Sequence, residues 1–386
     1  MRSTLAPETP RSVYIHVPFC RHRCGYCNFT LVAGRDDLVD SFLDALAIEL
    51  QQHGQTTEVD TIYLGGGTPT HLNVRHLRRL FALLSKWFSL AKDGEWSCEA
   101  NPLDCVDEKL ALLRECGVNR ISIGGQSFDD RKLSLLERDH RGIDLDSAIT
   151  ASLEYFESVS LDLIFAAPGE TLDSWQKDLR SGMSSGVTHL STYGMTVEKG
   201  SAFYGRLSKA QFAEVDEEIQ LAMYLSTIDQ LTEAGWDHYE ISSFAKNGRR
   251  CRHNEVYWTG RSWLAFGPGA ARFVDGWRSV NHRSTTQYIR LLQKGCSPTV
   301  ELEQLSREQC LREKFVFGLR RLEGVDLTWL SQNWGSDVEQ KFQPALDEFI
   351  ERGWLSRSDS RISLTRSGLV ISDSLWPRFL GESSLP

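Results

Sequence analysis

The chain has 386 residues, of which 41% are hydrophobic and 25% charged, as is typical of a globular protein with one large domain and a smaller one. Its net charge of -9 argues against a general nucleic-acid binder. No apolar run approaches the about eighteen residues of a membrane span, and the polar start of the chain does not resemble a signal peptide. We therefore expect a cytoplasmic protein without a membrane span, for which only peripheral membrane association stays open.

Apolar spacing predicts alternating strands and helices over the first 234 residues. Strands are expected at residues 12–17, 61–64, 96–100, 119–123, 161–165 and 189–196. Helices are expected at residues 37–52, 74–88, 106–116, within 129–136 and 144–156, and at 171–184 and 216–234. Because repeated strand-helix units imply parallel strands with right-handed crossovers, the sequence predicts an α/β fold with a partial (β/α)6 barrel.

The C-terminal region predicts a small, mainly helical domain that is winged-helix-like. Amphipathic helices are expected at 305–320 and 338–352, a hairpin at 353–356 and 361–364, and a closing helix at 365–375. Basic and acidic residues are interleaved there, which favours a lid or a partner-docking module over nucleic-acid binding. The expected domains are a flexible N-terminus (1–11), a core with a barrel extension (12–299), the C-terminal domain (300–377) and a loose tail (378–386).

Three cysteines follow the first predicted strand at C-x3-C-x2-C spacing: Cys20, Cys24 and Cys27. Thiolates are soft ligands, and one tight loop can direct all three at an inorganic cluster. A [4Fe-4S] cluster usually takes four cysteines, so three leave one iron open to a small molecule. A Cys3His zinc site with His16 or His22 is the alternative, although zinc ligands usually come as two separated pairs.

Polar and glycine residues gather where the predicted strands end. They are Gly65, Gly66, Gly67, Thr68, Glu99, Asn101, Gly124, Gly125, Gln126, Ser127, Asp162 and, in the last strand, Tyr193 and Gly194. In barrels of this type the chemistry lies at the C-terminal strand ends, so these residues predict a site. The glycine turn is neither a P-loop nor a dinucleotide fingerprint, but its bare backbone can approach a ligand and offer carbonyls to an ammonium group. The alternative is that the glycines only shape turns and that Asp162 only caps or pairs.

The cysteine motif resembles that of the radical S-adenosylmethionine (SAM) enzymes. With Gly65-Gly-Gly-Thr-Pro-Thr70, Glu99-Ala-Asn-Pro102, Arg120-Ile-Ser-Ile-Gly-Gly-Gln-Ser-Phe128 and Tyr239-Glu-Ile-Ser-Ser-Phe-Ala245, it is similar to the oxygen-independent coproporphyrinogen oxidase-like family over residues 12–375. The resemblance implies a [4Fe-4S] cluster on Cys20, Cys24 and Cys27. It also implies SAM contacts from Tyr14, Tyr26, Gly66, Gly67, Thr68, Glu99, Gln126, Arg138, Asp162 and Gly194.

Two branches of that family differ in function. The decarboxylating oxidases carry a further cysteine where this chain has Phe29, and the HemW-type heme chaperones carry His-Asn-x-x-Tyr-Trp, present here at residues 253–258. The resemblance therefore implies binding of heme and delivery to heme-acceptor proteins. The alternative is radical decarboxylation of coproporphyrinogen III propionates, and either activity implies an electron donor such as a flavodoxin or ferredoxin. This chain departs from the branch at one turn. The glycine-rich turn that follows usually ends in Gly-Ala-His, whereas here it ends in Ala271-Arg272.

The residues around His253 match heme group by group. An imidazole can ligate iron, the rings of Tyr257, Trp258 and Trp263 can cover the porphyrin, and the arginines of residues 249–252 can pair with propionates. His253 is therefore the candidate heme ligand. The alternative is a solvated charged turn, core tryptophans and a histidine that braces the mouth of the barrel.

Overall fold

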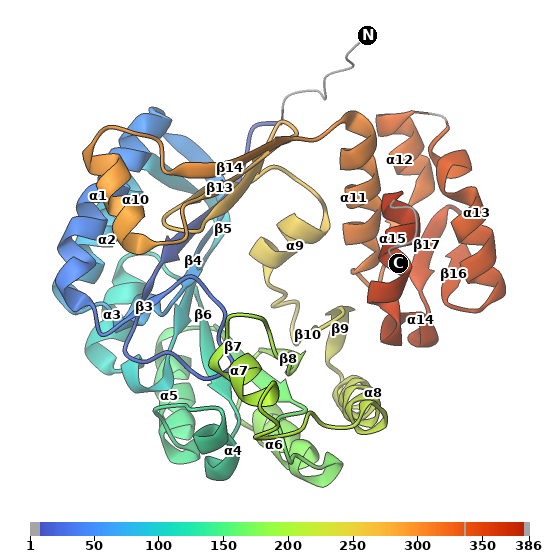
Figure 1. Cartoon of the computed structure of the whole chain (residues 1–386), viewed down its shortest axis with the longest axis horizontal. Coiled ribbons are helices and arrows are strands. Elements are labelled where there is room, and N and C mark those ends of the chain that lie inside the picture. The colour runs from blue at the N-terminus through green and yellow to red at the C-terminus, as the bar shows by residue number, and fades with distance from the viewer. Residues whose placement is uncertain (1–7, 336, 382–386) are drawn as a thin grey trace.

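A sheet of nine strands organises the computed structural model, which describes residues 8–335 and 337–381 (Figure 1). In spatial order the strands are β11 (Leu264–Phe266), β1 (Ser12–Val17), β4 (Thr57–Gly66), β5 (Phe88–Ala100), β6 (Arg120–Gln126), β7 (Ser158–Phe165), β8 (His189–Gly194), β10 (Ser243–Ala245) and β9 (Asp237–Glu240). The strands from β11 to β8 pair in parallel, whereas β10 pairs antiparallel with both β8 and β9. Within the described residues β11 and β9 are edges, so the expected partial barrel is confirmed as an open sheet.

The helices confirm the predicted alternation. They are α1 (Val39–His53), α2 (Val74–Trp87), α3 (Asp107–Glu115), α4 (Asp130–Leu135), α5 (Gly142–Tyr155), α6 (Leu172–Ser184), α7 (Ala202–Leu207) and α8 (Glu217–Glu233), with short turns η1 (Asp36–Leu38), η2 (Pro69–His71) and η3 (Pro102–Asp104). The predicted boundary at Phe88 was wrong. This residue begins β5 instead of ending α2, because its extended backbone pairs with Thr57 of β4.

The two faces of the parallel strands differ in chemistry. Side chains that face the helices are apolar and buried, as are Val13, Ile15 and Val17 of β1. The alternate side chains are polar and lie in register across the sheet. One row holds Tyr14, Tyr63, Ser97, Arg120 and Ser158, the next holds His16, Gly65, Glu99, Ser122, Ser160 and His189, and a third holds Gly124, Asp162 and Ser191. Parallel strands covered on both faces are usually apolar on both, so these inner rows indicate a cavity on this face.

Residues 246–304, for which the sequence predicted no elements, complete the core. The helix α9 (Arg252–Trp258) packs against β4 and β5 and lies between the sheet and the C-terminal helices (Figure 1). The strands β12 (Ala271–Val274), β13 (Trp277–Asn281) and β14 (Thr299–Gln304) form an antiparallel sheet, and α10 (Thr285–Gln293) packs on α1. The buried Glu49 of α1 accepts hydrogen bonds from the Gly267 amide, Asn281 Nδ2 and the Tyr288 hydroxyl at 2.9, 2.6 and 2.6 Å. One carboxylate thus fixes this extension to the core.

The C-terminal domain contains the expected helices and hairpin. Its elements are α11 (Arg307–Leu319), β15 (Val325–Asp326), α12 (Leu327–Trp334), α13 (Val338–Glu351), β16 (Leu355–Ser358), β17 (Arg361–Leu364), α14 (Arg366–Val370) and α15 (Ser372–Leu380). The expected closing helix is two helices, and the expected loose tail was wrong as far as Leu380. The reason is an apolar face on α15, from which Phe379 packs on Phe315 and Phe349.

Most of the expected flexible N-terminus, residues 1–7, lies outside the described residues. The remainder is held in place, because Glu8 accepts a hydrogen bond from the Ser262 amide and Arg11 forms an ion pair with Asp60. None of the helices in the described ranges is long and apolar enough to cross a membrane.

Candidate functional site

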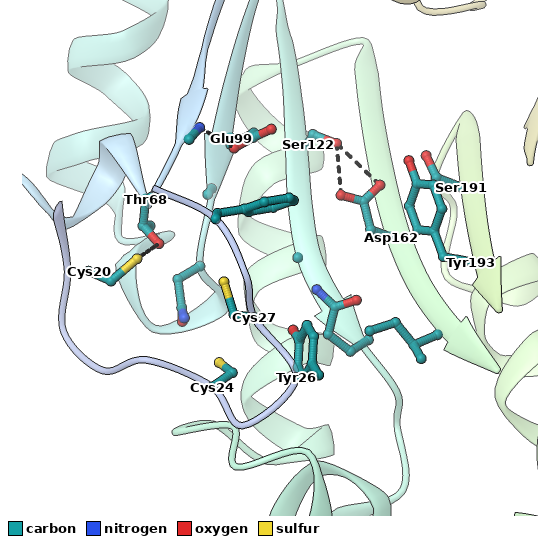
Figure 2. A pocket seen from close by; sticks show the side chains of 18 of the residues that line it. Cys20, Cys24, Tyr26, Cys27, Thr68, Glu99, Ser122, Asp162, Ser191 and Tyr193 are labelled. Carbon is teal, nitrogen blue, oxygen red and sulfur yellow. Dashed lines mark hydrogen bonds between the residues drawn. The ribbon is translucent and has the colours of Figure 1, made fainter. Parts of the chain in front are cut away.

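The inner rows line one cavity of about 410 Å³ at the C-terminal ends of the strands. Figure 2 shows the three cysteines on one side of it and Asp162 with Tyr193 on the other. The cavity brings together Cys20, Cys24, Cys27 and, of the residues predicted to contact SAM, Tyr26, Gly66, Gly67, Thr68, Glu99, Gln126, Arg138, Asp162 and Gly194. Tyr14 lies behind the wall, with its ring stacked 6.1 Å from that of Tyr63, which does line the cavity.

A short ladder holds the cysteines in place. The strands β2 (Phe19–Cys20) and β3 (Val32–Ala33) pair in parallel and fix both ends of residues 21–31, here called the cysteine loop. Cys20 Sγ lies 3.4 Å from the Thr68 hydroxyl, and Arg138 donates to Cys24 Sγ at 3.4 Å. Burial raises the pKa of Cys20 to about 11 and also raises the pKa of Cys27. In the metal-free chain these thiols hold their protons, which metal binding would release.

The cavity fits an anionic cluster with a zwitterionic ligand. Arg138 Nε is buried and has no hydrogen-bond partner among the described residues, so an anion beside Cys24 would satisfy it. The zinc alternative loses one ligand, because both ring nitrogens of His16 are engaged, by the Tyr14 hydroxyl at 3.1 Å and the Thr30 carbonyl at 2.6 Å. Across the described ranges, no three His, Cys, Asp or Glu side chains already converge on one ion position.

The glycine turn packs closely against the residues that precede the cysteine loop. Gly66 has φ +109°, and a Cβ there would lie 2.5 Å from the His16 ring, while a Cβ on Gly67 would lie 2.7 Å from the Phe19 carbonyl. Glycine is therefore required for packing at this turn as well as for access by a ligand.

Two half-buried carboxyl groups face the cavity. Glu99 accepts hydrogen bonds from the Tyr63 hydroxyl at 3.0 Å and the Gly66 amide at 3.1 Å, and burial together with the charge of Asp162 raises the pKa of Glu99 to about 7. Burial also raises the pKa of Asp162 to about 6, and Ser122 donates to this carboxyl at 3.4 Å. Both groups can accept hydrogen bonds from ligand hydroxyls or face a cationic ligand.

Sequence reasoning missed much of the cavity wall. The missed lining residues include Tyr63, Arg120, Ser122, Ser160, His189, Ser191, Cys251 and Asn254. A signal was present, because polar residues alternate with apolar ones in Arg120-Ile-Ser122-Ile and in Ser158-Val-Ser160-Leu-Asp162. A period of two places all of these side chains on one face of a strand.

His253 is a buried residue in the first turn of α9 and does not line the cavity. Its Nδ1 pairs with the Thr61 hydroxyl at 2.8 Å, its Nε2 pairs with the Tyr257 hydroxyl at 2.9 Å, and its ring stacks on Tyr63 at 5.1 Å. Burial lowers its pKa to about 3. In this arrangement neither nitrogen is free for iron, and the geometry is that of the bracing histidine considered as the alternative. A role in heme ligation stays a prediction that requires both hydrogen bonds to open.

The neighbouring arginines also have partners already. Arg249 pairs with Glu157 at 2.6 Å, and Arg250 pairs with Asp237 at 2.7 Å. Farther along the chain, the departure at Ala271-Arg272 lies on β12, and neither of its residues lines the cavity. The absence of the usual histidine at this turn therefore changes no group that faces this cavity.

Comparison with known proteins identifies related chains. Residues 14–181 match the family model of the radical SAM superfamily, and residues 305–371 match that of the HemN C-terminal domain. The heme chaperone HemW of Bacillus subtilis is 33% identical over 378 residues, which cover 96% of this chain and 100% of that protein. The heme chaperone HemW of Mycobacterium tuberculosis is 34% identical over 384 residues, which cover 97% and 96%.

One solved structure shares the fold over nearly the whole chain. The coproporphyrinogen III oxidase HemN of Escherichia coli superposes with a TM-score of 0.85, covering 97% of this chain and 91% of that one, at 23% sequence identity. At this identity the likeness concerns the fold alone.

Proposed function

Since the chain belongs to the radical SAM family and, within it, to the HemW heme chaperones, we propose that it binds heme and delivers it to acceptor proteins. Membership of the radical SAM family implies a [4Fe-4S] cluster and SAM as cofactors. The observation that carries the proposal is the match to HemW, which extends over nearly the full length of both chains. The exposed Phe29, in place of a further cysteine, supports the chaperone over the oxidase.

Cys20, Cys24 and Cys27 would hold the cluster, and the lining residues Glu99 and Asp162 would face SAM. When bound, the cluster supplies single electrons to SAM, and the protein contributes placement and exclusion of water. A small redox protein such as a flavodoxin or ferredoxin is the expected electron donor. The heme acceptor is expected to be a protein that uses heme as its prosthetic group.

The rim of the cavity supports a docking place for heme. Phe29 is 68% exposed there, and the exposed His22 carries an imidazole with no hydrogen-bond partner among the described residues. Heme needs an apolar face for its ring and an axial ligand for its iron, and these two side chains offer both. We infer that heme meets the rim first, while the groups around His253 are engaged in protein contacts.

The test assays one anaerobically reconstituted preparation for two activities. Heme binding is measured as Soret absorbance that survives gel filtration, and oxidase activity as decarboxylation of coproporphyrinogen III. The chaperone function predicts stable heme binding without decarboxylation. Decarboxylation without retained heme would replace the proposed function by that of the oxidase.

A further inference from the structure

A buried guanidinium faces the deep end of the cavity without a carboxylate partner. Arg120 is 2% exposed and lines the cavity, one row nearer the N-terminal ends of the strands than Glu99. Its guanidinium donates to the Ser158 hydroxyl at 2.9 Å and to the Arg249 carbonyl at 3.1 Å, both through one nitrogen. Neither acceptor is charged, and Arg120 forms no ion pair with any described residue. Glu95 and Asp162 act on this charge without pairing directly with it. A buried guanidinium without a directly paired carboxylate is costly, so an anionic occupant would stabilise it.

Glu95 and Asp162, whose charges act on Arg120, accept their hydrogen bonds from other groups. Glu95 accepts hydrogen bonds from the backbone amides of Arg252 and His253 at 3.2 and 3.1 Å. Asp162 lies nearer the mouth, one row above Ser122, whose hydroxyl donates to it at 3.4 Å. Both carboxylates therefore have other partners, and the remaining guanidinium nitrogens of Arg120 keep their donors for a ligand.

A second unpartnered donor lines the same cavity. Asn254 lies in α9, which packs against β4 and β5. Its side-chain amide lines the cavity and has no hydrogen bond to any described residue. Ser160 adds a hydroxyl from the neighbouring strand, paired with His189 at 2.8 Å. The deep end of the cavity thus combines a fixed positive charge with a neutral amide donor.

We propose that Arg120 and Asn254 form a carboxylate-binding subsite at the floor of the cavity, separate from the residues assigned to SAM. A guanidinium and a carboxamide can donate to the two oxygens of one carboxylate. The occupant is a carboxylic acid, either the propionate side chain of a tetrapyrrole or a small free carboxylate. The subsite itself does not depend on the proposed function. Only the assignment of its carboxylate to a tetrapyrrole rests on that function.

The test uses sodium propionate as the probe on the full chain with its cluster loaded. Affinity is measured by saturation-transfer NMR, and Arg120→Gln should weaken binding by about tenfold or more because it removes a charge-assisted contact. Arg249→Gln is the matched control. Its side chain is paired with Glu157 on the surface, so propionate affinity should not change.

A second variant keeps the test decisive if Arg120→Gln does not fold. Asn254→Asp leaves Arg120 in place and adds a competing carboxylate to the same subsite, so it should also weaken propionate binding by about tenfold or more. The subsite is refuted if the wild-type chain does not bind propionate, or if both variants bind it as the wild-type chain does.

Heme and heme dimethyl ester then distinguish the two sources. A wild-type preference for the free acid that Arg120→Gln removes assigns the subsite to the tetrapyrrole propionate. A preference that survives in Arg120→Gln assigns it to small free carboxylates. A chain that binds propionate but no heme retains the subsite and refutes the proposed function.

Discussion

Replacing His253 by alanine tests how the site is held together. His253 supports the ring of Tyr63 by stacking, and the Tyr63 hydroxyl donates to Glu99, the carboxyl group assigned to SAM. Without the imidazole, Tyr63 loses the surface that fixes its ring, and Glu99 loses an oriented donor. We therefore expect His253→Ala to weaken SAM binding, although His253 does not line the cavity.

The contacts of His253 set the size of two expected effects, the loss of stability and the loss of SAM affinity. The variant leaves the hydroxyls of the buried Thr61 and the half-buried Tyr257 without their partner, at about 1–3 kcal/mol each, and removes a ring stack worth about 0.5–1.5 kcal/mol. The free energy of unfolding should fall by roughly 2.5–7.5 kcal/mol, against a total of about 5–15 kcal/mol for a native protein. A weakened hydrogen bond to the Glu99 carboxylate, at about 1.5 kcal/mol or more, raises the Kd of SAM about tenfold.

The assay combines urea unfolding, titration calorimetry with SAM on the cluster-loaded protein, and Soret absorbance with heme. His238→Ala is the matched control, because this imidazole stacks on Phe244 at 4.2 Å outside the cavity, so stability should fall while SAM affinity stays. Tyr63→Phe should reproduce the SAM effect with less loss of stability. Unchanged SAM affinity together with lost heme binding in His253→Ala would refute this reasoning and support the ligand role predicted from sequence.

Three further predictions concern the cluster and the cavity. Cys24→Ala should abolish iron and sulfide loading and the paramagnetic signal of the reduced cluster without unfolding the chain; an unfolded variant would mean that Cys24 is a core residue. Arg283 donates to the Thr30 hydroxyl at 3.0 Å and the Asn28 carbonyl at 3.1 Å, so Arg283→Gln should shorten the half-life of the cluster in air severalfold, with thermal unfolding unchanged; an unchanged half-life would contradict a bracing role. Glu99 holds its proton more tightly when folded, so its contribution to stability is present at low pH and is lost as pH rises from its unfolded pKa through about 7. Glu99→Gln should therefore gain about 3 kcal/mol relative to the wild-type chain between pH 4.5 and 8 in urea unfolding, and a pH-independent difference would contradict this.

The sequence predicted those features that depend on residues close together in the chain. The cysteine spacing lies within one loop, and the strand-helix alternation follows from the apolar outer face of each strand, as in Val13, Ile15 and Val17. The glycine turn was predicted to approach a ligand, and the sequence did not reveal that Gly66 and Gly67 also pack closely on His16 of β1 and Phe19 of β2. Such a contact is set by the register of β1 against β4, which a single strand does not reveal.

The interpretation of residues 249–263 shows the limit most clearly. The arginines, the histidine and the aromatic rings matched heme by type, yet their partners come from distant parts of the chain. His253 bonds to Thr61, and Arg249 pairs with Glu157. Composition can suggest a ligand for such a cluster, whereas only the tertiary contacts show which of its groups remain free.

These distant contacts also explain why the radical SAM segment needs the rest of the chain. The family match ends at residue 181, but the cysteine loop is braced by Arg283, and a Cβ on Gly269 would lie only 2.6 Å from the Thr30 hydroxyl of that loop. The helix α9 also supports the cavity, because its His253 stacks on Tyr63 and its Asn254 lines the cavity wall. The inner rows place Arg120, Glu99 and Asp162 around one cavity, and charges partly withdrawn from water hold their places only where neighbouring groups fix them. Residues 246–304 supply several of these neighbours, so we expect them to determine what this cavity binds besides SAM.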